Sequence, residues 1–133
     1  MNKLTNILLV DDDPIANYVN KTLLEKIDGV EQVTTAPNGK VALQLLEQQT
    51  SPNNTPDLIL LDINMPVMNG IEFMQAYKEL AIEGKETIKV IILTTSNHPR
   101  DLACFTDLPI AGFLNKPLTS GKISGLLDEH FPA

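Results

Sequence analysis

The chain has 133 residues, a formal net charge of −7, and 43% hydrophobic residues. This length suits one compact domain, and there is no cluster of Lys and Arg to form the basic face that nucleic acids require. Its apolar runs are strand-length, too short to span a bilayer, and the N-terminus lacks a signal-peptide pattern. The single cysteine, Cys104, allows no internal disulfide. We therefore expect a cytoplasmic protein.

Short apolar segments alternate with amphipathic segments along the whole chain. The first half predicts a strand at residues 6–10, a helix at 14–27, a strand at 30–35 and a helix at 38–46. After a polar loop at 48–56, the second half predicts strands at 57–61, 88–93 and 110–114, which alternate with helices at 71–80, 99–106 and 120–131. Strands that are apolar throughout are buried on both faces, so this order predicts an α/β fold with helices on each side of a parallel sheet. We expect one domain over residues 1–133, without an output domain.

Polar side chains follow four of the five predicted strands. They are Asp11 and Asp12 after the first strand, Asp62 after the third, Thr94 after the fourth and Lys116 after the fifth. Open parallel sheets bind ligands beyond the carboxyl ends of their strands, so we expect these side chains to share one site. Carboxylates about 4 Å apart repel each other by roughly 4 kcal/mol per pair at an effective dielectric near 20, which favours a bound cation. Oxygen ligands with an open side suit Mg²⁺, and an aspartate in that setting can accept a phosphoryl group.

Some of these residues also fit purely structural roles. Asp13, directly before the first predicted helix, fits a helix N-cap better than a metal ligand. Thr94 is compatible with a hydroxyl that only satisfies backbone groups. Lys116 alone fits a solvated surface residue, and Phe113 alone fits a core residue.

Four segments resemble the receiver domain of two-component response regulators, in the same order. They are LLVDDDP at 8–14, LILLDINMPVMNG at 58–70, ILTTS at 92–96 and FLNKP at 113–117. The resemblance covers nearly the whole chain and is to the single-domain, CheY-like form. It implies a flavodoxin-like (βα)5 three-layer sandwich with a parallel sheet of order 2-1-3-4-5.

The resemblance also implies a role for each site residue. Asp62 would be the phosphoacceptor, and the Mg²⁺ ligands would be Asp11, Asp12, Asp62 and the backbone carbonyl of Asn64. Thr94 and Lys116 would contact the phosphoryl group. The Lys116–Pro117 peptide bond would be cis. Thr94 and Phe113 would form the switch that remodels a protein-interaction surface.

The implied partners are a sensor histidine kinase or a histidine phosphotransfer protein and a downstream protein target, with no nucleic acid or membrane. The implied protein is a signalling protein, not an enzyme, apart from self-catalysed phosphotransfer and autodephosphorylation. An FMN-binding protein of this fold would need a phosphate loop rich in Ser, Thr and Gly where this chain is acidic. A phosphatase of the haloacid-dehalogenase type would need a second aspartate two residues after Asp62, where this chain has Asn64. A degenerate receiver that acts as a phosphorylation-independent binding scaffold is the alternative.

Overall fold

The fold is seen in a computed structural model, which describes residues 4–48, 55–63, 68–81, 85–94, 108–116 and 118–131. Its sheet has five parallel strands in the order β2-β1-β3-β4-β5, which confirms the expected order. The strands are β1 (Asn6–Val10), β2 (Gln32–Ala36), β3 (Leu58–Asp62), β4 (Lys89–Thr94) and β5 (Gly112–Asn115).

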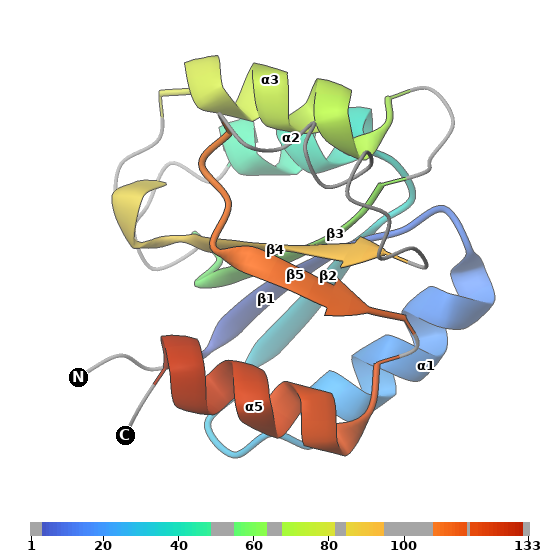
Figure 1. The fold of residues 1–133 in the computed structure, drawn as a ribbon. Coiled ribbons are helices and arrows are strands. Elements are labelled where there is room, and N and C mark those ends of the chain that lie inside the picture. Colours follow the sequence, from blue (N-terminus) through green and yellow to red (C-terminus); the bar gives the residue numbers. More distant parts are fainter. Residues whose placement is uncertain are drawn as a thin grey trace.

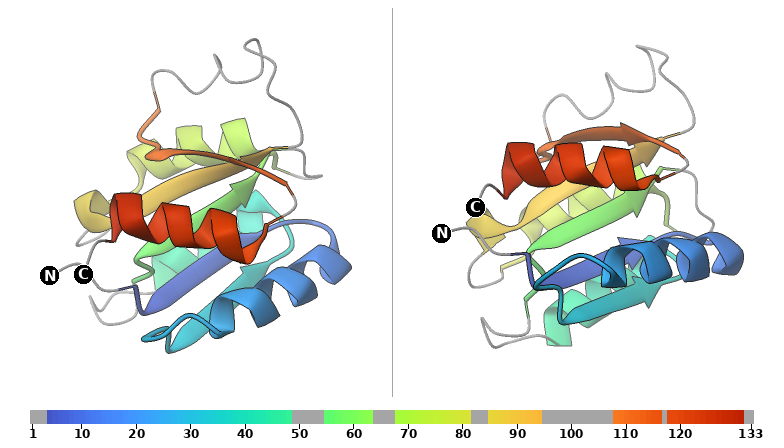
Figure 2. Two further views of the ribbon diagram at one scale, coloured as in Figure 1. Left: turned by 60° about the horizontal axis from the view of Figure 1, so that its bottom comes forward. Right: turned by 90° about the horizontal axis from the view of Figure 1, so that it is seen from below.

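Helices cover both faces of this sheet. They are α1 (Pro14–Glu25), α2 (Gly39–Gln48), α3 (Gly70–Glu79) and α5 (Ser120–His130), with a short 3-10 helix, η2 (Lys85–Thr87). Figure 1 shows α2 and α3 above the sheet and α1 and α5 below it, and Figure 2 shows α1 and α5 side by side over the lower face. The predicted helix at 99–106 lies outside the described residues, as does much of the predicted loop at 48–56. Within the described part of the chain, no helix is long and apolar enough to cross a membrane.

The sheet separates two apolar cores, and β3 shows how. Leu58 and Leu60 pack into the core under α1 and α5, whereas Ile59 and Leu61 pack into the core under α2 and α3. Side chains of a strand alternate between its faces, so a strand between two helical layers has to be apolar on both. The prediction that strands apolar throughout are buried on both faces is confirmed for β3 and holds nearly throughout β1 and β4, whereas β2 and β5 are less buried. Those two strands form the edges of the sheet and are partly exposed.

Several predicted boundaries shift by one or two residues because of tertiary hydrogen bonding. β3 and β4 extend one residue further than predicted, to Asp62 and Thr94, because these residues pair with Leu93 and Asn115 of the neighbouring strands. The second strand begins two residues later than predicted, after a turn in which Gly29 has a φ of 94°. Such a positive φ favours glycine. The third strand likewise begins one residue later, at Leu58.

Local side-chain bonds fix the helix starts that lead away from the sheet edge. Asp13 caps α1 by accepting a hydrogen bond from the backbone N–H of Ile15 at 2.9 Å, and Pro14 follows in the first turn. This confirms the N-cap interpretation of Asp13. Asn69 caps α3 through a reciprocal pair of hydrogen bonds with Glu72. Both helices therefore start at the carboxyl edge of the strand that precedes them.

Candidate functional site

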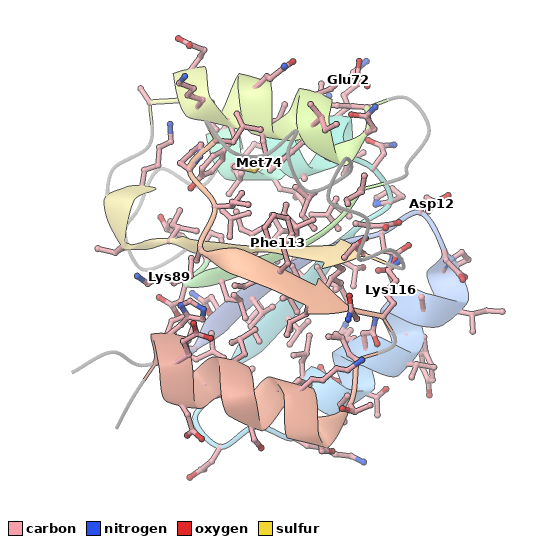
Figure 3. All side chains as sticks on the ribbon, in the orientation of Figure 1. Asp12, Glu72, Met74, Lys89, Phe113 and Lys116 are labelled. Atoms are coloured by element: carbon pink, nitrogen blue, oxygen red, sulfur yellow. The ribbon has the colours of Figure 1, made fainter. Side chains whose placement is uncertain are left out.

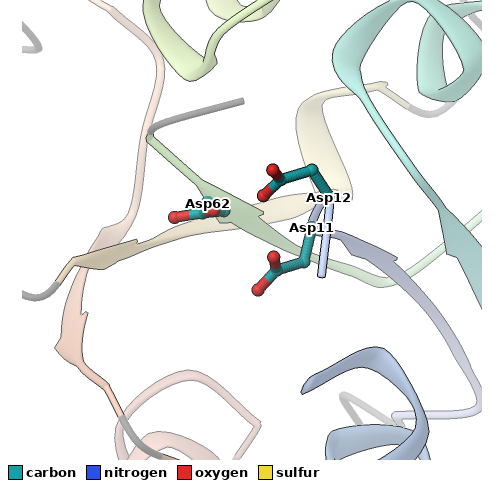
Figure 4. A group of neighbouring side chains, drawn as sticks. All are labelled: Asp11, Asp12 and Asp62. Atoms are coloured by element: carbon teal, nitrogen blue, oxygen red, sulfur yellow. The ribbon is translucent and has the colours of Figure 1, made fainter. Parts of the chain in front are cut away.

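Three carboxylates meet at the carboxyl edge of the sheet. Asp11 and Asp12 follow β1, and Asp62 is the last residue of β3. The two strands are neighbours in parallel register, with Val10 opposite Leu61, so their ends coincide. Carboxylate oxygens of all three residues lie within 4.8 Å of one another (Figure 4). Asp11 and Asp62 are buried, with exposed fractions of 1% and 7%, whereas Asp12 is open to solvent.

Lys116, which follows the edge strand β5, brings a positive charge into this cluster. Its Nζ lies 2.9 Å from Oδ2 of Asp11 and 3.1 Å from Oδ1 of Asp62. The residue directly follows β5, and its backbone N–H donates to the carbonyl of Thr94 at 2.8 Å. Figure 3 shows Lys116 and Asp12 at the same edge of the fold. The predicted meeting of the acids and the lysine is therefore present in the structure.

The electrostatics of the cluster reflect this crowding. Burial raises the pKa of Asp62, the hydrogen bond and charge of Lys116 lower it, and the charges of Asp11 and Asp12 raise it again, with a net rise. Burial lowers the pKa of Lys116, but its hydrogen bonds to Asp11 and Asp62 and their negative charges outweigh burial and raise it. One ammonium thus faces three carboxylates, and a further cation would be stabilised there.

Two contacts that shape the site were not predicted from the sequence. The side-chain amide of Asn17 donates from Nδ2 to the backbone carbonyl of Asp11 at 2.8 Å. Gly70 lies so close to the end of β3 that a Cβ there would stand 2.9 Å from the carbonyl oxygen of Asp62. The sequence predicts a helix at 71–80, but nothing local in it indicates how closely the start of this helix approaches the end of β3.

The residues assigned to the switch lie along β4 and β5. Thr94 is buried at the end of β4, at 4% exposed, and Phe113 on β5 is 38% exposed. Phe113 is therefore not a core residue, and the core interpretation of it is wrong. Asn64 and Pro117 lie outside the described residues, so the carbonyl ligand and the cis peptide bond stay predictions.

The donor set of the cluster fits Mg²⁺. It consists of carboxylate oxygens, which this hard cation prefers, and the exposed side of Asp12 leaves room for the water molecules that Mg²⁺ retains.

Comparison with known proteins agrees with this geometry. A family model, the response regulator receiver domain, matches residues 7–128. The chain belongs to this family. The two-component response regulator ORR41 of rice (Oryza sativa subsp. japonica) is 30% identical over 125 residues, which cover 94% of this chain and 93% of that protein. The nitrate/nitrite response regulator protein NarL of Escherichia coli K12 is 33% identical over 112 residues, which cover 84% of this chain and 48% of NarL.

Among solved structures, a two component response regulator from Cytophaga hutchinsonii superposes with a TM-score of 0.82 at 28% identity, covering 98% of this chain and 99% of that one. The chain thus spans about half the length of relatives such as NarL and nearly the full length of others. Receiver domains are signalling proteins of two-component systems rather than classical enzymes, and the family typically binds Mg²⁺ at an acidic cluster like this one.

Proposed function

We propose that this receiver domain is a cytoplasmic phosphoacceptor. Asp62 would accept a phosphoryl group from a histidine kinase or a histidine phosphotransfer protein in a Mg²⁺-dependent reaction. The observation that carries the proposal is the placement of a buried carboxylate, Asp62, against two further acids and one ammonium. The chain covers 93% of the two-component response regulator ORR41, which supports a role in two-component signalling.

The transfer itself needs little covalent chemistry from the protein. A carboxylate oxygen of Asp62 attacks the phosphorus of the donor's phosphohistidine, the N–P bond breaks, and the imidazole leaves and takes up a proton. Asp11, Asp12 and Asp62 would hold Mg²⁺, with the carbonyl of Asn64, and the ion would neutralise charge on the phosphoryl oxygens. Lys116, which lies 3.1 Å from Asp62, is placed to pair with the phosphoryl group once the Asp62 carboxylate has been consumed.

An exposed apolar stripe next to the acids supports docking of a protein donor. Ile15, Tyr18 and Val19 are 74%, 73% and 55% exposed, and their spacing of three and four residues puts them on one face of α1. The helix begins directly after the acidic turn (Figure 1), so a donor seated on this stripe could present its phosphohistidine to Asp62. Ile15→Ser should lower the rate of transfer from a protein donor and leave labelling by acetyl phosphate unchanged.

Phosphorylation would then bias a two-state equilibrium at Thr94 and Phe113. Moving such an equilibrium from 1:99 to 99:1 takes about 5.5 kcal/mol of differential binding. A new hydroxyl bond from Thr94 and a new ion pair with Lys116 are charge-assisted contacts of the strength needed for much of this. Lys116→Ala should therefore leave phosphorylation possible but uncouple it from the conformational change.

The deciding experiment is mass spectrometry after incubation with acetyl phosphate and Mg²⁺. We expect one phosphoryl group per chain, mapped to Asp62, and none in Asp62→Asn. Asp28→Asn, which neutralises an exposed loop carboxylate, is the matched control and should label normally. Equal labelling of wild type and Asp62→Asn would exclude Asp62 as the acceptor. Absence of label and of any response to beryllofluoride with Mg²⁺ would favour the alternative, a degenerate receiver that acts as a binding scaffold.

A further inference from the structure

We propose that Asn17 is a positioning residue for the metal site, a role that rests on the proposed function. Asn17 lies in the first turns of α1, and its Nδ2 donates to the backbone carbonyl of Asp11 at 2.8 Å. That carbonyl belongs to the peptide group joining Asp11 to Asp12. The hydrogen bond therefore holds the peptide group between the two acids that follow β1.

Several hydrogen bonds hold the turn around this peptide. The N–H of Asp11 donates to the carbonyl of Ala36 on β2 at 3.1 Å, and Oδ1 of Asp11 accepts from the N–H of Asp13 at 3.0 Å. The carbonyl of Asp11 is the group that Asn17 holds. Asp11 also has a direct side-chain anchor, because its Oδ2 accepts from Lys116 at 2.9 Å. The carboxylate of Asp12 is exposed. We therefore expect its direction to depend more than that of Asp11 on the orientation of the peptide group that joins the two residues.

The carbonyl oxygen of the Asn17 side chain indicates that this amide does more than stabilise the fold. Its Oδ1 is buried and has no hydrogen-bond partner among the described residues. Burying an unpaired carbonyl oxygen is unfavourable, and a leucine of nearly the same size would avoid it.

The test is Mg²⁺ affinity and amide hydrogen exchange in the unphosphorylated protein. Asn17→Leu and Asn17→Ala both remove the donor, and the second guards against a packing fault in the first. Thr22→Ala is the matched control, because it removes another side-chain bond to backbone on the same helix, from Oγ1 of Thr22 to the carbonyl of Tyr18 at 2.9 Å. We expect both Asn17 variants to raise the Mg²⁺ dissociation constant by about fivefold, the worth of one hydrogen bond, and to speed amide exchange at residues 11–13.

The control should keep wild-type affinity and wild-type exchange at the acidic turn. If the Asn17 variants stay within about twofold of wild type, or if Thr22→Ala weakens binding equally, the positioning role is wrong, since the effect is absent or belongs to α1 as a whole. The exchange measurement needs no metal. A wild-type protein that binds no Mg²⁺ would therefore overturn the proposed function, whereas unchanged exchange in the variants would overturn the role of Asn17 alone.

Discussion

Lys116→Met should lower the free energy of unfolding at neutral pH, because it removes an electrostatic attraction whose contribution depends on pH. The Lys116 ammonium lies 2.9 Å from one carboxylate and 3.1 Å from another. At an effective dielectric near 20, each attraction at about 3 Å is roughly 5–6 kcal/mol, most of it offset by desolvation. Removing one partner of a buried pair costs about 3–5 kcal/mol, and because the lysine side chain is 22% exposed we expect about 3 kcal/mol. Domains of this size have a free energy of unfolding of about 5–15 kcal/mol, so the variant should still fold.

The pH dependence of this loss follows from Asp62. Burial raises the pKa of Asp62, and Lys116 lowers it, so the variant loses only a lowering influence and the pKa rises further. A carboxyl with a raised pKa in the folded state stabilises the fold below its ordinary value of 3.8 and loses that contribution as the pH rises through the folded-state pKa. The deficit of Lys116→Met relative to wild type should therefore be large at neutral pH and shrink toward about pH 4.

Urea unfolding at several pH values, with and without Mg²⁺, measures this directly. Mg²⁺ at 100 times its dissociation constant stabilises by about 2.7 kcal/mol, and it should help the variant more than wild type because the competing ammonium is gone. Lys40→Met, which removes an exposed lysine on α2, is the matched control and should change stability by less than about 0.5 kcal/mol. A deficit that is the same at pH 4 and pH 7 would mean that lost packing, not charge, is responsible, and would refute the electrostatic reasoning.

Two backbone features carry further predictions. Gly70→Ala should destabilise by about 1–3 kcal/mol and slow labelling of Asp62, because the new Cβ would meet the Asp62 carbonyl at 2.9 Å. Gly125→Ala in α5, where a Cβ meets nothing within 4 Å, should instead stabilise by about 0.5–1 kcal/mol, and a loss in both variants would contradict the close-approach argument. Asp57→Ala should cost about 2–3 kcal/mol in urea unfolding, because Oδ2 of Asp57 accepts three hydrogen bonds, at 2.8–3.0 Å, from Thr5 and Asn6 at the start of β1. An unchanged midpoint in Asp57→Ala would show that these bonds contribute nothing net.

The amino-acid sequence alone was enough to predict the order of the described elements, the parallel sheet and the site residues contributed by its strands. Apolar periodicity is local information, and the carboxyl ends of parallel strands share an edge whatever the details of packing. The motif resemblance added the strand order. These patterns therefore predict that Asp11, Asp12, Asp62, Thr94 and Lys116 lie at the carboxyl ends of the strands, on one side of the fold.

Other features were decided only by the tertiary structure. The ion pair between Lys116 and Asp11 spans 105 residues and depends on the register of four neighbouring strands. The exposure of Phe113 follows from the position of β5 at the edge of the sheet. The contacts of Asn17 and Gly70 arise where a helix start meets a strand end, and no periodic pattern encodes such distances. A sequence specifies which faces are buried, but packing sets the last few ångströms on which the chemistry depends.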